Sequence, residues 1–166
     1  MKYLVIGHKD HGKDEVCKIL RDTYGVTYRS SSMVCLEEFL YEKLRLKYRY
    51  TSMEECFLDR DNHRLEWRDE IRAFNIPKDK LSKIILAQAD TYCGLRCHLE
   101  FAASKYLYDR IIWVNASNRL PVLDESLTIQ FDPTCMVNLD NNGPESDLPR
   151  QVKIALSKNL VANPIG

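Results

Sequence analysis

The strongest constraint on the fold of this chain is a short apolar run that leads into a loop bounded by glycines. Residues 2–6 read KYLVI, residues 7–14 read GHKDHGKD, and the next apolar positions, Val16, Ile19 and Leu20, have helical spacing. This order predicts a buried parallel strand, a loop and a helix. Backbone N–H groups in such a loop, together with the positive end of the helix, attract an anion. The segment therefore predicts a site for the phosphates of a nucleotide.

The residue types in the loop fit that task, with one exception. Lys13 is expected to reach the β- and γ-phosphates. A side chain at Gly7 or Gly12 would hold the backbone away from the anion, or would forbid the positive φ that such loops need. The residue after Lys13 is Asp14, where a hydroxyl ligand to Mg²⁺ is usual. A gapped glycine pattern also arises by chance, but its place between a strand and a helix favours a phosphate site.

Composition indicates one globular domain without an overall charge. The chain has 166 residues, of which 45% are apolar, and at about 150 residues per domain this leaves little room for a second core. Lys plus Arg and Asp plus Glu both number 24, so no global positive field recruits nucleic acid or an anionic membrane. The cysteines lack paired spacing, no signal peptide is evident, and no apolar run reaches the roughly 20 residues of a membrane span. We therefore expect reduced thiols, a cytoplasmic location and no membrane partner.

Strand and helix patterns alternate along the chain. We expect helices at 13–24, 33–44, 53–74, 81–88, 99–106 and 148–160, and further strands at 26–29, 91–93, 110–114 and 135–139. Gly25 is expected to end the first helix, the serines at 30–32 to cap the second, and Ser52 and Glu55 to form a capping box at the start of the third. This order predicts an α/β fold with a parallel sheet covered by helices on both faces, and ligands at the carboxyl ends of the strands. Polar or cationic residues follow each strand there, so one cleft could hold them together: Ser30, Ser31, Ser32, Arg96, Asn118, Arg119, Asn141, Asn142 and Gly143.

The helix expected at 53–74 carries two arginines on its apolar side. The stripe follows steps of three or four residues through Met53, Phe57, Arg60, Arg64, Trp67, Ile71 and Phe74. A buried arginine without a partner costs several kcal/mol, so this face should meet a carboxylate or an anionic ligand. One interpretation is an ion pair with Asp59, Asp61, Glu66 or Asp69. The other is a phosphate-binding face, which the planar guanidinium group favours, with His63 and Arg68 at its margin.

These motifs resemble the P-loop kinases of the nucleoside monophosphate kinase group, and most of all the deoxynucleoside monophosphate kinases of tailed bacteriophages. The resemblance rests on residues 7–14, on Gly94, Leu95 and Arg96 before a helix with Glu100, on residues 113–119, and on residues 137–143. It implies a three-layer P-loop kinase fold over residues 1–166, with an acceptor-binding helical insert at about 33–76 and a short lid at about 117–133. Asp14 in place of the usual hydroxyl residue after Lys13 is itself similar to the loop of that family. Glu15, where such kinases often have Thr, leaves Asp14 or a water to hold Mg²⁺.

The resemblance also implies an activity and a set of site residues. The activity is the ATP- and Mg²⁺-dependent transfer of a γ-phosphate to a (deoxy)nucleoside monophosphate, in a host cytoplasm if the chain is phage-encoded, and a homodimer is possible. The catalytic set is Lys13, Arg96, Arg119 and Asp10, and the metal ligand is Asp14. The ATP-binding set is Gly7, His8, Lys9, Asp10, His11, Gly12, Lys13, Asp14, Glu15, Asn141 and Asn142. The acceptor-binding set is Ser30, Ser31, Ser32, Arg60, His63, Arg64, Trp67, Arg68 and Gln88.

Two other functions fit parts of the sequence. Some related phage kinases phosphorylate the hydroxymethyl group of 5-hydroxymethyluracil in DNA, and such a hydroxyl acceptor benefits from a carboxylate base such as Asp10, Asp59 or Asp61. The basic residues within 43–50 could then follow a DNA backbone, although most such runs are solvated surface. The neutral net charge and the lack of a carboxylate after the second strand favour the nucleotide acceptor. A nucleotide-binding protein without turnover is the third possibility, but it would have no second phosphate for Arg60 and Arg64.

Overall fold

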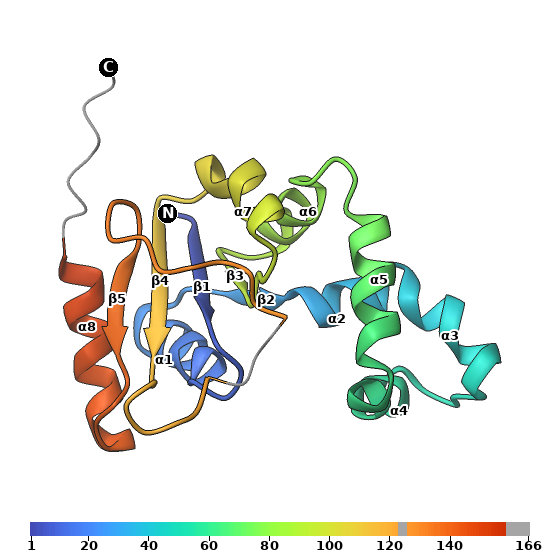
Figure 1. The fold of residues 1–166 in the computed structure, drawn as a ribbon, viewed down its shortest axis with the longest axis horizontal. Helices are drawn as coiled ribbons and strands as arrows, with labels where there is room; N and C mark the ends of the chain where they lie inside the picture. The colour runs from blue at the N-terminus through green and yellow to red at the C-terminus, as the bar shows by residue number, and fades with distance from the viewer. Residues whose placement is uncertain (123–125, 159–166) are drawn as a thin grey trace.

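The computed structural model describes residues 1–122 and 126–158 and is built around a five-stranded, all-parallel sheet (Figure 1). The strand order is β2-β3-β1-β4-β5, so β1 lies at the centre. This confirms the predicted α/β fold with a parallel sheet between helices. The strands are β1 (Tyr3–Gly7), β2 (Tyr28–Ser30), β3 (Thr91–Cys93), β4 (Arg110–Asn115) and β5 (Val137–Asp140).

Two strands begin later than the sequence pattern predicts, because the residues before them bond elsewhere. Val26 donates its N–H to the Leu20 carbonyl at the end of the preceding helix, at 3.1 Å. The backbone and hydroxyl of Thr27 both donate to the Asp90 carboxylate. Before β5, the backbone N–H groups of Cys135 and Met136 both donate to the Asp132 carbonyl in a turn. These backbone groups are therefore not free to join the ladder.

Side chains alternate across β1 and set the three layers. Val5 packs in the cluster beneath α1 (Lys13–Tyr24) and α8 (Leu148–Ser157), which contact each other on one face of the sheet. Leu4 and Ile6 point to the opposite cluster, to which α6 (Lys80–Gln88) contributes. α7 (His98–Ser104), followed by η3 (Lys105–Leu107), lies near α6 (Figure 1). A 3₁₀ turn, η4 (Glu145–Asp147), leads into α8, and the predicted end of that helix at Leu160 lies outside the described residues.

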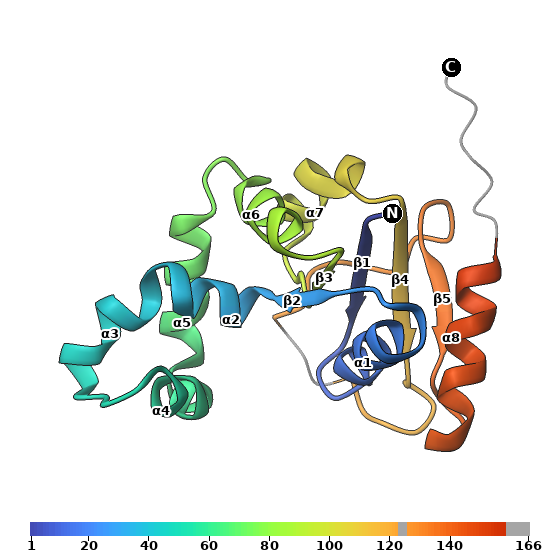
Figure 2. The ribbon, with the colours of Figure 1, turned by 180° about the vertical axis from the view of Figure 1, so that it is seen from behind.

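Between β2 and α6 the chain forms an all-helical extension to one side of the sheet (Figures 1 and 2). We call residues 31–74 the insert. A nearly continuous helical run comprises α2 (Ser31–Cys35), a π-helical turn η1 (Leu36–Leu40) and α3 (Tyr41–Tyr48). It ends at Arg49, which has a left-handed φ of 58°. The return comprises α4 (Met53–Leu58), a 3₁₀ turn η2 (Asp59–His63) and α5 (Arg64–Phe74).

The prediction of one helix over 53–74 is wrong, because η2 interrupts it. The Asp59 carboxylate accepts hydrogen bonds from Asn62 Nδ2 at 2.6 Å and from the Tyr50 hydroxyl at 2.6 Å. Such local side-chain bonds compete with a continuous helical ladder. The expected stripe consequently does not share one face: Trp67 is buried, whereas Met53 and Arg64 are exposed.

The predicted helix starts at Ser30 and Ser52 are confirmed. The Ser30 hydroxyl accepts from the Met33 amide at 3.3 Å, and the Ser52 hydroxyl accepts from the Glu55 amide at 3.1 Å. The reciprocal half of the second cap lies one residue earlier than expected, since the Glu55 carboxylate accepts from the amide and hydroxyl of Thr51. Among the described residues, no helix combines the length and the apolar character needed to cross a membrane.

Candidate functional site

The loop after β1 lies where the chain changes direction across the sheet. From β1 the chain crosses to β2 on the far side of β3, and from β3 it crosses past β1 to β4. Open α/β sheets bind ligands outside the carboxyl ends of the strands at such a reversal. Gly7 pairs with Val114, Ser30 with Cys93 and Asn115 with Asp140, so the loops after all five strands begin along one edge. That edge is the candidate site.

The glycine loop, defined as Gly7 to Gly12, wraps the start of α1. Lys13 is 8% exposed, and its Nζ donates to the His8 carbonyl at 2.8 Å. Asp10 and Gly12 both have positive φ, and Gly12 caps α1 without a side-chain bond. In the described part of the chain, the amides of Gly12 and Asp14 donate to no acceptor. Unpaired amides beside a cation at a helix start are suited to an anion.

Contacts with neighbouring residues require glycine at both positions of the loop, whether or not a ligand binds. A Cβ at Gly7 would lie 2.6 Å from the backbone oxygen of Val114 on β4, closer than real contacts allow. A Cβ at Gly12, where φ is +102°, would lie 2.5 Å from Nδ2 of Asn141. Sequence reasoning related these glycines to the phosphates. In the structure each also makes room for a neighbouring strand or loop.

The loops after β4 and β5 are hydrogen-bonded to the glycine loop. His11 is fully buried, and its Nδ1 accepts from the Ala116 amide at 3.2 Å. Asn141, which is 5% exposed, donates from Nδ2 to the His11 carbonyl at 2.8 Å. Arg119 donates from Nε to the Asn141 carbonyl at 2.6 Å. The structure thus brings three of the predicted site residues into one network, and Ala116 is a member that sequence reasoning missed because only its backbone takes part.

The environment of His11 favours a neutral imidazole. Burial lowers its pKa from the usual 6.5, and the positive charges of Lys13 and Arg119 act in the same direction. The Pro121 carbonyl and Asp10 oppose this shift but do not cancel it. Because Nδ1 accepts the Ala116 bond, the proton of the neutral ring resides on Nε2.

The cation after β3 contacts part of the predicted lid. Arg96 donates from Nη1 to the Ser126 hydroxyl at 3.0 Å, and its carbonyl accepts from the Thr128 amide at 2.9 Å. The Thr128 hydroxyl in turn accepts from the His98 amide at the start of α7. Leu127 is buried, so this stretch is packed onto the body of the protein. Residues 123–125 of the predicted lid lie outside the described residues.

Neither stripe arginine of the insert has a carboxylate partner within the described residues. Arg60 lies over the Phe57 ring, with 3.8 Å from Cζ to the ring centroid, and donates to the Phe57 carbonyl at 2.8 Å. Arg64 is exposed at the start of α5. Across residues 1–122 and 126–158, no carboxylate lies within ion-pair distance of either one. Three of the four carboxylates proposed as partners bind elsewhere: Asp59 to His63, Glu66 to Lys47 and Asp69 to Arg68.

Other predicted acceptor residues have different surroundings. His63 lies between the Asp59 carboxylate, 3.0 Å from Nε2, and the Tyr48 ring, 4.0 Å between centroids. Trp67 is 4% exposed in the core of the insert. Arg68 is paired with Asp69 on the surface of α5. Gln88 ends α6 just before the amino end of β3, at the edge of the sheet opposite the glycine loop, so the structure does not bring it to the candidate site.

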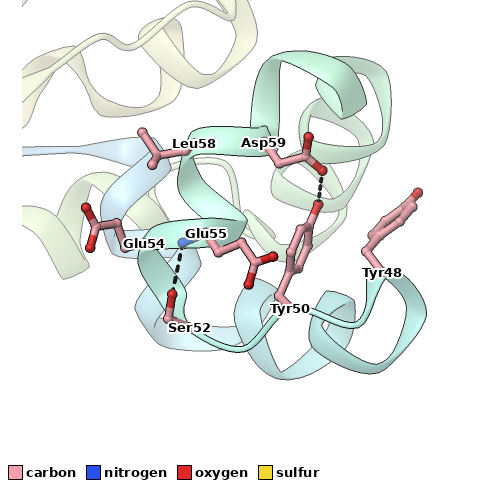
Figure 3. Close-up of a pocket in the computed structure, with 7 residues that line it drawn as sticks. All are labelled: Tyr48, Tyr50, Ser52, Glu54, Glu55, Leu58 and Asp59. Carbon is pink, nitrogen blue, oxygen red and sulfur yellow. Dashed lines mark hydrogen bonds between the residues drawn. The ribbon is translucent and has the colours of Figure 1, made fainter.

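A hollow of about 640 Å³ on the insert is distinct from the candidate site (Figure 3). Its walls are Tyr48, Tyr50, Ser52, Glu54, Glu55, Leu58 and Asp59. Figure 3 shows the Tyr50 hydroxyl directed at Asp59 and the Ser52 hydroxyl at the Glu55 amide. Three carboxylates around one opening repel a phosphate, so this hollow does not suit a nucleotide acceptor.

The two acidic residues after Lys13 differ in whether their carboxylates could bind a metal ion. Asp14 is exposed on the first turn of α1, with one carboxylate oxygen 3.6 Å from Cys93 Sγ. Glu15 is engaged by Lys18 Nζ at 2.7 Å. No group of three metal-ligating side chains occurs in the described residues. Mg²⁺ commonly uses one or two carboxylates together with substrate phosphates and waters, and Asp14 fits that requirement.

The candidate site therefore combines unpaired amides, a nearly buried lysine and two arginines from neighbouring loops. Such groups can hold and neutralise phosphates in close proximity. Comparison of the sequence with protein-family models and with curated proteins found no match. The functional conclusion consequently rests on the chain's own residues.

Proposed function

We propose that this protein is an ATP- and Mg²⁺-dependent phosphotransferase that moves the γ-phosphate of ATP to a (deoxy)nucleoside monophosphate. The observation that carries the proposal is the glycine loop at the carboxyl end of the central strand, where the amides of Gly12 and Asp14, next to Lys13, donate to no acceptor among the described residues. Loop amides, a helix start and a lysine are the groups that bind nucleotide phosphates. Asp14 would hold Mg²⁺, which would neutralise charge on the phosphates.

We assign two cations, Arg96 and Arg119, to the transferring phosphoryl group. Arg96 follows β3 and Arg119 follows β4, and these strands are the two neighbours of β1. Phosphoryl transfer depends on positioning and on neutralising developing charge more than on covalent chemistry. Arginines on both sides of the glycine loop supply that charge.

The insert supports a phosphate as acceptor. Arg60 and Arg64 carry positive charge that no described carboxylate neutralises, and Arg60 is already oriented by the Phe57 ring and carbonyl. The DNA-hydroxyl alternative has less support. Hydrogen bonds from Tyr50 and Asn62 lower the pKa of Asp59, which makes it a weaker base. Lys43 and Lys47, in the basic segment, pair with Glu70 and Glu66.

The first test is a phosphotransfer assay with ATP, Mg²⁺ and a panel of deoxynucleoside and ribonucleoside monophosphates, alongside DNA containing 5-hydroxymethyluracil. We expect a nucleoside diphosphate as product. Lys13→Ala should reduce kcat/KM by about a hundredfold to a thousandfold, since it removes a preorganised cation. Lys18→Ala, on the exposed side of α1, is the matched control and should retain activity. Undiminished turnover in Lys13→Ala would refute the proposal, and product on the DNA alone would favour the hydroxyl acceptor.

A second test separates the acceptor half from the donor half. Arg64→Ala should raise the acceptor KM or lower kcat while leaving the ATP KM unchanged. Arg45→Ala removes an exposed arginine of the insert that is paired with Glu42, and serves as the control. If Arg64→Ala weakens both substrates equally, Arg64 has a structural role.

A further inference from the structure

Asn141 lies where the ends of three strands meet. Its backbone N–H donates to the Asn115 carbonyl after β4 at 2.8 Å, and its own carbonyl accepts from Arg119. Its side chain crosses to the loop after β1 and donates to the His11 carbonyl at 2.8 Å. At 5% exposure, little of the residue remains for a ligand to contact.

We infer that Asn141 is a positioning residue for the glycine loop and does not recognise the nucleotide base. This inference rests on the proposed function, which makes the loop the donor-phosphate site. The resemblance noted in the sequence implies an ATP-binding role for Asn141. In the structure its side-chain amide instead donates to the backbone of the glycine loop.

The contacts of residue 11 give Asn141 its effect on the loop. The His11 backbone is held by Asn141, and its side chain is held by the Ala116 amide. The next residue is Gly12, whose missing Cβ leaves the space that the Asn141 amide occupies, 2.5 Å from where that Cβ would lie. Fixing residue 11 on both sides also fixes the direction of the unpaired Gly12 amide and of Lys13 beyond it.

Asn142 provides a matched control one residue away. Its Oδ1 accepts from the Asn118 amide at 2.8 Å, and its Nδ2 donates to the Asp140 carboxylate at 2.7 Å. In the described residues it makes no hydrogen bond to the glycine loop. Both asparagines were predicted to bind ATP, and the structure gives them different partners.

The test measures binding of Mg²⁺ complexes of ATP, GTP and inorganic tripolyphosphate to the full chain. Asn141→Asp replaces the donor Nδ2 by an oxygen that faces the His11 carbonyl, so a buried acceptor loses its bond. We expect affinity for all three ligands to fall by the same factor, about tenfold or more. Asn142→Asp adds the same negative charge one residue away, so it should weaken tripolyphosphate binding several-fold less than Asn141→Asp does. If Asn141→Asp changes the preference between ATP and GTP but spares tripolyphosphate, the residue contacts the base and the inference is overturned.

Amide hydrogen exchange supplies a readout that needs no ligand. Asn141→Asp should speed exchange at Ala116, whose N–H donates to His11, while Val114 in β4 keeps its protection. Unchanged exchange at Ala116 would overturn the inference. If Asn141→Asp does not fold, Asn141→Ser is measured in the same way. Failure of the wild-type protein to bind any of the three ligands would refute the proposed function, whereas the exchange experiment would still decide the positioning role.

Discussion

Replacing Gly7 by alanine should loosen the central pair of strands at the edge that carries the site. Gly7 is the last residue of β1 and is paired in register with Val114 on β4. The added Cβ would lie 2.6 Å from the Val114 backbone oxygen, and the next atoms of Val114 lie at 3.4 Å. A flexible side chain could move aside, but a backbone oxygen in a sheet can move only if the strands separate.

The size of the effect follows from that geometry. Overpacking a filled interior costs about 1–3 kcal/mol, and a clash with immobile backbone belongs at the upper end of that range. We therefore expect Gly7→Ala to lower the free energy of unfolding by about 2–3 kcal/mol. For a chain of this length that corresponds to a fall in Tm of roughly 4–12 °C.

Alanine substitutions at two other glycines serve as controls for the steric clash at Gly7. Gly25→Ala meets no heavy atom within 4 Å but keeps a φ of +67°, so it should cost about 1 kcal/mol from backbone strain alone. At Gly143 the nearest atom to an added Cβ is Asp147 Oδ2 at 3.6 Å, an ordinary contact, and the change should stay within about 0.5 kcal/mol. Urea unfolding followed by tryptophan fluorescence would rank the variants. A Gly7→Ala protein as stable as Gly143→Ala would refute the steric argument.

Two further predictions concern buried or bonded side chains. The stability of the wild-type protein should fall as pH drops below about 6.5, because burial lowers the pKa of folded His11 and the unfolded chain takes up the proton first. His11→Asn should flatten that slope between about pH 7.5 and 5 in urea unfolding curves, and an unchanged slope would contradict this origin. Tyr50→Phe removes the hydroxyl that donates to Asp59 and should cost about 1 kcal/mol. It should also raise the pKa of Asp59, and an NMR titration of that carboxyl that shows no rise would contradict the assignment.

The elements that sequence predicted well are those whose signals are local. The apolar run of β1, the helix stop at Gly25 and the caps at Ser30 and Ser52 each depend on neighbouring residues, and each is found where expected. The parallel sheet between helices also follows from the alternation of strand and helix patterns. These signals were sufficient for the fold class and for placing the loops at one edge of the sheet.

The insert shows why helical spacing alone was misleading. Steps of three and four residues place side chains on one face only if the helix is continuous. At Asp59 the bonds to Asn62 and His63 are themselves local, but the bond from Tyr50 comes from the turn before α4. Once η2 changes the helix direction, Arg60 packs on Phe57 and Arg64 lies in solvent. The sequence pattern assigns both arginines to one buried helical face, and the interrupted helix does not form that face.

The contacts within the candidate site could not be predicted because they join distant parts of the chain. The bond from Asn141 to His11 spans 130 residues, and the bond from Ala116 to His11 spans 105. Which atoms meet there depends on how far each loop extends beyond its strand, a quantity that no local pattern encodes. Sequence could suggest that Asn141 belongs to the site, because it follows a strand. The contacts in the packed structure distinguish a residue that would touch a nucleotide from one that holds the loop in shape. Substituting the first kind of residue would alter ligand preference, whereas substituting the second kind would weaken every phosphate ligand equally.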